Sequence, residues 1–527
     1  MTLPRFIDRV GDALVGAAVG DRADLLAHLD TLVVEVSLSP RCATAGGGAE
    51  TTTLTAAVLA RLYPAFWVSG DQTAVGAFTD EVHRVNPLAS VTHSDAPSTH
   101  SLLSLAVAGA PPVTVDVDGW HVLLDTECRI DARPSASPVV GLLAAALGAA
   151  YLFRSAFRHS VPRGRHEIEP ATINLVTLQS WTDDVPLPMH GPNVGDLHLA
   201  GAGAVGQAAV LGLAAHAEVF GLEGVVHVID PETVTLSNLQ RYALAYDGDE
   251  GKAKVDLAVA KLQAAKVDAH AALERWGDGP ASRPGRHSVL VALDTAADRL
   301  AVAAGTHASV WNAYTSTTDI GWSRHEQLGV LPCLGCMYWP THTRPSRHEE
   351  IAAALRQHPL RVISYLVTHL PVGAPLQLVP TIAELPAPLE APTWLATSLL
   401  HDLLGNGHLS PEQALAWANR DIEGLYRDGV CGGALVGLSG SVTGEVLVPL
   451  AHQSLVAGLM LSLQPLLSAD PQLRELRPDS IDARLNLLAP LPPIIARPRT
   501  RTSGCLCGDT DYQAAAGSRP RAPTPVM

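Results

Sequence analysis

The chain has 527 residues, of which 47% are hydrophobic and 17% charged, and its formal net charge is −16. This length exceeds what one hydrophobic core usually serves, and it predicts about three to four domain-sized units. The acidic balance and the lack of a basic patch disfavour a nucleic-acid-binding role, but they leave room for a basic protein partner.

The expected compartment follows from the N-terminus, the apolar runs and the cysteines. The first ten residues lack an apolar run behind basic residues, so no secretory signal is expected. The longest apolar run, Pro138 to Phe153, is too short for a membrane span and predicts a buried helix. Seven cysteines that include a CxxC pair suit a reducing compartment with metal-bound or catalytic thiols. We therefore expect a cytoplasmic protein that makes no membrane contact.

Residues 1–190 predict a first α/β domain, because short apolar runs alternate with helical patterns there. The domain lacks a glycine-rich loop followed by a strand with an acidic end, and Gly46 to Gly48 are best interpreted as a plain connection into a helix. Strands are expected at Leu32–Val36, Ala65–Val68, Leu102–Val107, Val113–Val117 and His121–Leu124, and helices at Thr53–Leu62 and Val139–Phe157.

The next domain, residues 191–340, opens with a nucleotide-binding pattern. An apolar strand over residues 197–200 is followed by Gly201, Gly203 and Gly206 and then by a helical pattern, and the second strand ends at Asp230. Such glycines let backbone amides approach phosphate, and a carboxylate at the second strand end can accept hydrogen bonds from ribose hydroxyls. Taken alone, this pattern is most typical of a dinucleotide-dependent oxidoreductase.

Three motifs downstream change that interpretation: residues 237–241 read SNLQR, residues 251–254 read GKAK, and a strand ends at Asp294. Together with the glycine loop they resemble the ThiF/MoeB and ubiquitin-activating-enzyme (E1-like) superfamily, and in particular its bacterial ubiquitin-like conjugation type. Its members adenylate the C-terminal carboxylate of ubiquitin-like proteins. The resemblance extends from Asp196 to Met337.

The resemblance implies ATP and Mg²⁺ as cofactors and gives each motif residue a role. Asp230 would hold the ribose, Asn238 and Arg241 the phosphates, and Asp294 the Mg²⁺, while Lys254 would stabilise charge at the α-phosphate. Adenylation brings a triphosphate, a metal ion and an anionic nucleophile together, so positive charge must converge at the site.

The resemblance also implies that residues 1–190 are a degenerate, inactive copy of the adenylation fold. Two Rossmann-like, doubly wound halves in one α/β chain would then do together what two subunits do in a homodimer. The resemblance also leaves open a homodimer of the whole chain. In homodimeric members the partner supplies an arginine to the nucleotide site, and Arg5, Arg9 and Arg41 are the candidates here. One departure is Tyr242, where the family commonly has glutamine.

Four cysteines predict a structural zinc site. Cys333 and Cys336 form a CxxC pair, and Cys505 and Cys507 form a CxC pair near the C-terminus. Four thiolates are the usual ligand set of a closed tetrahedral Zn²⁺ site. The family usually has CxxC at the second position as well. Zinc would staple the C-terminus to the active half.

The segments between and beyond the cysteine pairs predict a helical insert at residues 341–430, C-terminal completion of the adenylation fold at 431–512, and a disordered tail at 513–527. Cys431 begins the completion segment and is flanked by glycines, which leave a thiol accessible and its loop mobile. The resemblance makes it the candidate thioester nucleophile, with Cys42 and Cys128 as alternatives.

The leading interpretation is an enzyme that adenylates a ubiquitin-like protein, transfers it to Cys431 as a thioester and feeds a conjugating (E2-like) enzyme. A bacterial modification or antiviral defence pathway would be its setting. The main rival is adenylation of a sulfur-carrier protein without a thioester. An NAD-dependent oxidoreductase or a non-catalytic scaffold is disfavoured, because Asn238, Arg241, Lys254 and Asp294 would have no purpose in either.

Overall fold

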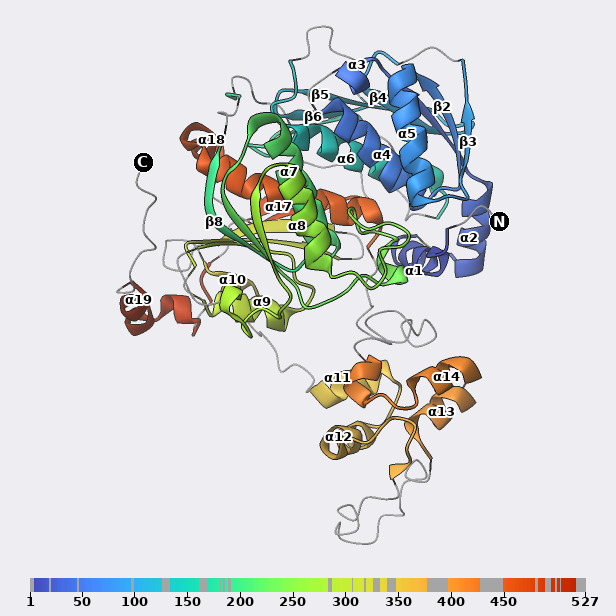
Figure 1. Ribbon diagram of the computed structural model, residues 1–527, viewed down its shortest axis with the longest axis vertical. Helices are drawn as coiled ribbons and strands as arrows, with labels where there is room; N and C mark the ends of the chain where they lie inside the picture. The colour runs from blue at the N-terminus through green and yellow to red at the C-terminus, as the bar shows by residue number, and fades with distance from the viewer. Residues whose placement is uncertain are drawn as a thin grey trace. The chain divides into compact units, whose positions relative to one another are not determined.

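The computed structural model (Figure 1) divides the chain into two compact units, Met1–Trp339 with Pro449–Met527, and Pro340–Val448. It describes residues 4–18, 20–44, 47–95, 99–125, 133–160, 169–180, 182, 185–187, 191–282, 287–305, 307–316, 319–325, 332–338, 347–376, 397–406, 408–426, 449–478, 482–488, 494–497, 500–502 and 504–517.

The first sheet of the larger unit has seven strands in the order β3-β2-β1-β4-β5-β6-β7. Strands β1, β2 and β3 are parallel, and β4 to β7 continue the sheet antiparallel. The five strands predicted from the sequence are all present. The strands are β1 Val33–Leu38, β2 Ala65–Gly70, β3 Ser90–His93, β4 Leu103–Val107, β5 Val113–Asp118, β6 His121–Leu124 and β7 Ala171–Asn174.

Helices of the first half begin at recognisable caps. Asp71 accepts hydrogen bonds from two amides of the first turn of α5, and Ser137 caps α6 with Pro138 as its first residue. The predicted helix after the three glycines is α4. The helices are α1 Ile7–Ala17, α2 Arg22–Thr31, α3 Arg41–Thr44, α4 Gly48–Ala60, α5 Gln72–Val85 and α6 Pro138–Ala156.

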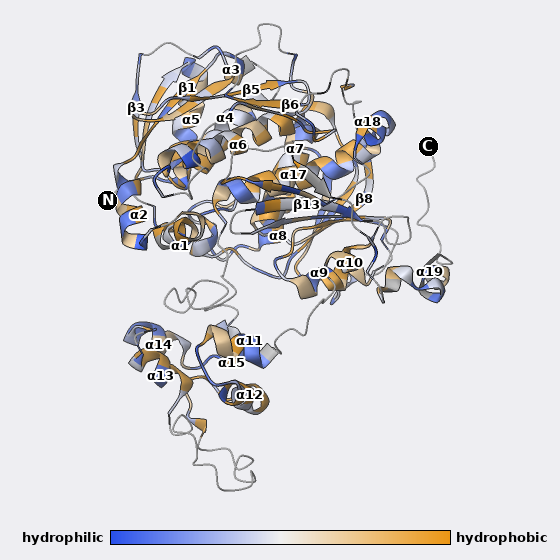
Figure 2. Cartoon of the chain, turned by 180° about the vertical axis from the view of Figure 1, so that it is seen from behind, coloured by the Kyte–Doolittle hydropathy of each residue, from blue (hydrophilic) through white to orange (hydrophobic). Residues whose placement is uncertain are grey.

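Helix α6 is the one described helix that is long and apolar enough to cross a membrane, and Figure 2 shows its hydrophobic colour. However, 94% of its most apolar window is buried inside the larger unit. It packs against α4, α17 and the first sheet. This confirms the expectation of a buried core helix.

The second sheet has eight strands in the order β10-β9-β8-β11-β12-β13-β14-β15. Strands β10, β9, β8, β11 and β12 are parallel to one another. Strands β13, β14 and β15 are each antiparallel to the strand that precedes them in this order. The chain thus moves outward from β8 to β10 and then returns to the other side of β8, a reversal that creates a crevice at the carboxyl ends. The strands are β8 Asn193–Ala200, β9 Glu223–Ile229, β10 Asp268–Ala272, β11 Ser288–Val291, β12 Ser309–Thr315, β13 Asp319–His325, β14 Asp482–Asn486 and β15 Ile495–Arg497.

Two apolar helices pack together in the second half, α7 (Ala204–Phe220) and α17 (Ala451–Ala469), which lie side by side in Figure 1. Glycines bring them close: a β-carbon on Gly458 would lie 2.2 Å from the Val205 carbonyl oxygen. The other helices of this half are α8 Lys254–Ala264, α9 Ala296–Ala303, α10 Leu334–Tyr338, α18 Pro471–Leu476 and α19 Thr510–Gly517, with 3-10 turns at Leu236–Asn238, Pro280–Ser282 and Leu506–Gly508.

The smaller unit is helical where it is described, as predicted for the insert. Its own core gathers apolar side chains such as Ile351, Val362, Tyr365 and Leu403. Its helices are α11 Arg347–Ala354, α12 Pro359–Thr368, α13 Leu399–Gly405, α14 Pro411–Trp417 and α15 Ile422–Gly424. At the C-terminus, α19 extends into the segment from residue 513 that was expected to be disordered, and residues 518–527 lie outside the described part.

Gly458→Ala should destabilise the protein by about 1–3 kcal/mol, because the added methyl group would overlap the α7 backbone. Gly76→Ala is the matched control. Gly76 is exposed in mid-helix with open space around it, so alanine there should stabilise by about 0.5–1 kcal/mol. Urea denaturation would measure both. Equal stability of Gly458→Ala and the wild type would refute the close packing of α7 on α17.

Candidate functional site

The turn between β8 and α7 is built from two glycines that no other residue could replace. Gly201 has a φ of +95°, and a β-carbon there would lie 2.7 Å from the Ala292 carbonyl oxygen. A β-carbon on Gly206 would lie 2.0 Å from the Gly201 carbonyl oxygen. Gly203 precedes α7 and has no such overlap. The turn thereby places the N-terminus of α7, with its unpaired amides, at the crevice of the sheet.

Asp230 lies at the carboxyl end of β9, directly beside this turn. Its side chain is 8% exposed and accepts hydrogen bonds from the Ala202 amide at 2.7 Å and the Glu232 amide at 2.8 Å. Burial raises the pKa of the Asp230 carboxyl, although Lys254 and the two amides oppose that shift. Each carboxylate oxygen has capacity for another hydrogen bond, as a ribose hydroxyl would require.

Lys254 is the first residue of α8 and is 4% exposed. Its ammonium group donates to the Glu232 carboxylate and lies 5.2 Å from the centroid of the Tyr242 ring. Burial opposes its charge, yet Tyr242, Asp230 and Glu232 together raise the pKa of Lys254 above its ordinary value. The structure therefore holds a desolvated, permanently charged ammonium next to Asp230. The sequence analysis did not identify Glu232 as a partner of Lys254, although it follows Asp230 by two residues.

Arg241 and Asn238 lie on the segment that follows β9. The Asn238 side-chain oxygen accepts from the Thr235 amide at 3.0 Å, so it caps a 3-10 turn. Half-buried Arg241 makes a 3.4 Å hydrogen bond to the Ser237 carbonyl oxygen. Its guanidinium lies 5.5 Å from the centroid of the Tyr242 ring, the same ring that Lys254 faces. Tyr242 thus connects the two cations.

A second arginine from the first half joins this group. Arg9, on α1, is 6% exposed, and burial together with the Arg241 charge lowers its pKa to about 10. Its Nε and Nη1 atoms make no hydrogen bond to the residues that the structure describes, although Asp12 lies 3.5 Å from Nη1. Two neighbouring guanidinium groups, of which Arg9 has unsatisfied donors, fit a phosphate chain.

The other two candidate arginines have carboxylate partners. Arg5 contacts Asp247 at 2.5 Å, and Arg41 contacts Asp116 at 2.7 Å. Of the three arginines named from the sequence, Arg9 is the one that the structure brings to Arg241.

Asp294 follows β11, the strand on the other side of β8, and its side chain is exposed. Its backbone oxygen accepts from Arg299 at 3.4 Å, and Arg299 is itself buried and bonded to Asn312 at 3.1 Å. Because the carboxyl ends of parallel strands share one sheet edge, Asp294 lies on the same edge as Asp230. A carboxylate there suits Mg²⁺, which binds through one or two carboxylates and the substrate phosphates.

Side chains of the first half also contact the loop that follows Arg241. Arg61, 3% exposed, donates to the carbonyl oxygens of Tyr242 at 2.6 Å and Ala245 at 3.0 Å. The Tyr246 hydroxyl donates to Glu81 at 2.9 Å, and the Arg84 guanidinium lies 3.6 Å from the Tyr246 ring centroid. No sequence signal marked these contacts, since they join residues far apart in the chain.

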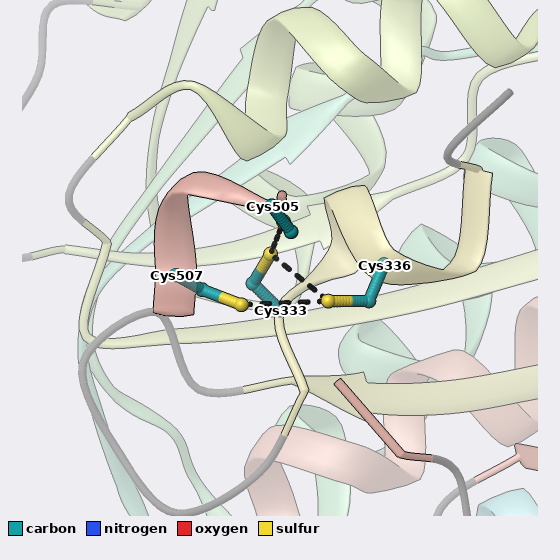
Figure 3. Close-up of side chains that lie close together, drawn as sticks. All are labelled: Cys333, Cys336, Cys505 and Cys507. Carbon is teal, nitrogen blue, oxygen red and sulfur yellow. Dashed lines mark hydrogen bonds between the residues drawn. The ribbon is translucent and has the colours of Figure 1, made fainter. Parts of the chain in front are cut away.

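The four predicted zinc cysteines converge in one buried cluster (Figure 3). The sulfur atoms of Cys333 and Cys505 are 3.5 Å apart, those of Cys336 and Cys507 are 3.4 Å apart, and all four lie within 4.8 Å of one another. Tetrahedral zinc with Zn–S bonds of about 2.3 Å needs sulfurs about 3.8 Å apart. The Thr502 amide donates to Cys336 Sγ at 3.4 Å, a bond that favours the thiolate. The donor set and spacing therefore fit Zn²⁺.

The proposed thioester cysteine, Cys431, lies outside the described residues, as does Cys128. Cys42 is 1% exposed, and its thiol donates to the Leu102 carbonyl oxygen at 3.0 Å. Burial raises its pKa. A buried, protonated thiol is a poor nucleophile, so the structure disfavours Cys42 for thioester formation.

Comparisons with known proteins bear on the domain that carries these residues. The model of the ThiF family matches residues 196–306. An uncharacterised protein of Sinorhizobium fredii, y4jF, is 30% identical over 531 residues, which cover 98% of this chain and 96% of that protein. The chain belongs to the ThiF family. This confirms the ThiF part of the resemblance drawn from the motifs, while the ubiquitin-like conjugation type and the inactive first half stay predictions.

Two solved structures share weaker similarity. E. coli MccB, in a crystal structure with succinimide, is 14% identical, with 59% of this chain and 66% of that chain covered and a TM-score of 0.31. A crystal structure of PaaA is 22% identical, with 26% of this chain and 43% of that chain covered and a TM-score of 0.21. TM-scores this low do not establish a shared fold on their own.

Purified protein should contain Zn²⁺ at the cysteine cluster, because four thiolates make a closed tetrahedral site. Cys336→Ser and Cys507→Ser should each lose that ion and lower the melting temperature, as measured by elemental analysis and thermal unfolding. Cys42→Ser, which changes a cysteine outside the cluster, should keep it. Full retention of zinc in both cluster variants would contradict this assignment.

Proposed function

We propose that the chain uses ATP and Mg²⁺ to adenylate the C-terminal carboxylate of a ubiquitin-like protein and then carries that protein as a thioester on Cys431. ThiF-family membership supports E1-like adenylation chemistry, and members of this family act with ubiquitin-like or sulfur-carrier proteins. The observation that carries the proposal is the convergence of Arg9, Arg241 and Lys254 beside the glycine turn and Asp230.

In the proposed reaction a carboxylate oxygen of the protein substrate bonds to the α-phosphorus of ATP. The bond from that phosphorus to the bridging oxygen breaks, and pyrophosphate leaves with the electron pair. Asp230 binds the ribose and the amides at the start of α7 bind phosphate oxygens. Lys254 stabilises negative charge at the α-phosphate, and Arg9 and Arg241 hold the leaving pyrophosphate. Mg²⁺, held with Asp294, would neutralise phosphate charge.

The same cations weigh against an oxidoreductase. A nicotinamide dinucleotide carries only a pyrophosphate, which the glycine turn and helix N-terminus can bind without further cations. Three buried or half-buried positive charges are better matched to a triphosphate and an anionic nucleophile. The location of Arg9 on α1 further supports a non-catalytic first half that completes the site of the second.

Lys254→Ala, Arg241→Ala and Arg9→Ala should each lower partner-dependent ATP–pyrophosphate exchange by about a hundredfold, since loss of one preorganised charge costs on the order of 3 kcal/mol. Asp294→Asn should weaken the dependence of the rate on Mg²⁺. Lys261→Ala is the control, because Lys261 pairs with Glu218 on the helix surface. Exchange near the wild-type rate in the Lys254 and Arg241 variants would refute the site.

Incubation with ATP, Mg²⁺ and the ubiquitin-like partner should give a slower-migrating band that reductant collapses. Cys431→Ala should abolish this band and retain ATP–pyrophosphate exchange, because adenylation needs the phosphate site and not the thiol. Cys42→Ala is the matched control and should keep the band. Absence of the band in the wild type would favour adenylation of a sulfur carrier, and its persistence in Cys431→Ala would move the nucleophile elsewhere.

When a conjugating (E2-like) enzyme is added, the labelled partner should pass from Cys431 to that enzyme. Gel filtration would show whether one chain acts alone, as two joined halves permit, or as a homodimer.

A further inference from the structure

Histidines gather on one face of the second sheet, outside both sites described above. His198, His227 and His270 lie opposite one another on β8, β9 and β10, in one row across three neighbouring strands. His287 and His307 precede β11 and β12 and extend the group. Consecutive rings stand 3.8 to 5.4 Å apart between centroids. Neither the nucleotide site nor the cysteine cluster uses any of these imidazoles.

The centre of the group is a close trio of possible metal ligands. The His198 and His287 rings stack with centroids 3.8 Å apart, and Asp196 Oδ1 lies 2.9 Å from His198 Nε2. One donor atom from each of Asp196, His198 and His287 lies within 4.8 Å of the other two. His198 is 6% exposed and His287 is 8% exposed, whereas the Asp196 side chain is 53% exposed. The trio thus has a buried imidazole side and an open carboxylate side.

One buried ring nitrogen of the trio, His287 Nε2, makes no hydrogen bond to any described residue. An unsatisfied buried polar atom is unfavourable, so one that lies in a stacked pair of imidazoles next to a carboxylate calls for an explanation. The Asp196 carboxylate lies within hydrogen-bond distance of His198 Nε2, so an oxygen and a ring nitrogen that could bind one ion already stand together.

The electrostatics of the group favour neutral rings. Burial and the neighbouring histidines lower the pKa of His287 to about 3, and burial lowers that of His198, with Asp196 acting in the opposite direction. Neutral imidazole is the form that binds metal ions.

We propose that Asp196, His198 and His287 form a binding site for a divalent transition metal ion such as Zn²⁺, separate from the four-cysteine cluster. Two nitrogens and one carboxylate oxygen are a ligand set that zinc accepts, with a fourth position left to water. His227, 30% exposed, and His270, 59% exposed, line the approach from solvent.

Equilibrium dialysis against Zn²⁺ tests this proposal on the full chain. The wild type should hold two ions, His198→Gln and His287→Gln one, and the combination of either with Cys336→Ser none. Loss of one ligand should weaken the second site by about a hundredfold. His270→Gln is the matched control: it removes a histidine of the same row that is not a ligand, and it should keep two ions. A single ion in the wild type, or two ions in both buried-histidine variants, would overturn the proposal.

A variant at the exposed ligand and a nearby tryptophan distinguish loss of the metal site from misfolding. Asp196→Asn changes an exposed side chain, so it should fold normally while it loses the second ion. Trp276 lies 6.4 Å from both His198 and His287 between ring centroids. Co²⁺ should therefore quench part of the protein fluorescence in the wild type, and that part should vanish in Trp276→Phe and in Asp196→Asn. Quenching of equal size in Asp196→Asn and wild type would also count against the site.

Discussion

The hydrogen bond from the Ala202 amide to Asp230, together with the tight turn that makes it possible, fixes the geometry of the candidate adenylation site. The turn can form only because Gly201 and Gly206 lack side chains where the Ala292 and Gly201 carbonyl oxygens approach. Its closure brings the ends of β8, β9 and β11 to one place and leaves the first amides of α7 facing the crevice. Lys254 is held beside this turn by its hydrogen bond to Glu232 and its electrostatic interaction with Asp230.

The first half contributes structure to this site in two ways. It supplies the buried Arg9 guanidinium, and it holds the loop that carries Tyr242 through the two hydrogen bonds of Arg61. A charged donor to backbone oxygens in a buried setting contributes about 1.5–3 kcal/mol for each bond. The loop is therefore held from outside its own sheet, and Tyr242 keeps its place between Lys254 and Arg241. Such dependence explains why the two sheets belong to one compact unit.

Local patterns predicted much of the fold and the glycine turn, because a strand, a helix and a turn each leave their period or residue type in a short stretch. The cysteine cluster was also predictable, since two close pairs have few other uses. The features that the sequence could not predict depend on contacts between distant residues. They include the proximity of Arg9, rather than Arg5 or Arg41, to Arg241. They also include the hydrogen bonds that Arg61 donates and the Glu232 partner of Lys254. The histidine row needed the register of three strands, which no single segment contains.

The cysteine cluster constrains more of the chain than its four residues suggest. It joins Cys336 to Cys507, and the segment between them includes the whole smaller unit, α17 and β14. Zn²⁺ bound by the four thiolates would cross-link this segment and, in the chain-entropy model, would remove about 5 kcal/mol of unfolded-state entropy at 25 °C. The residues on each side of the smaller unit are then tied to fixed elements, α10 before it and α17 after it. An insertion between two such anchors can vary in sequence and length without disturbing the adenylation site, because both of its ends are held in the larger unit.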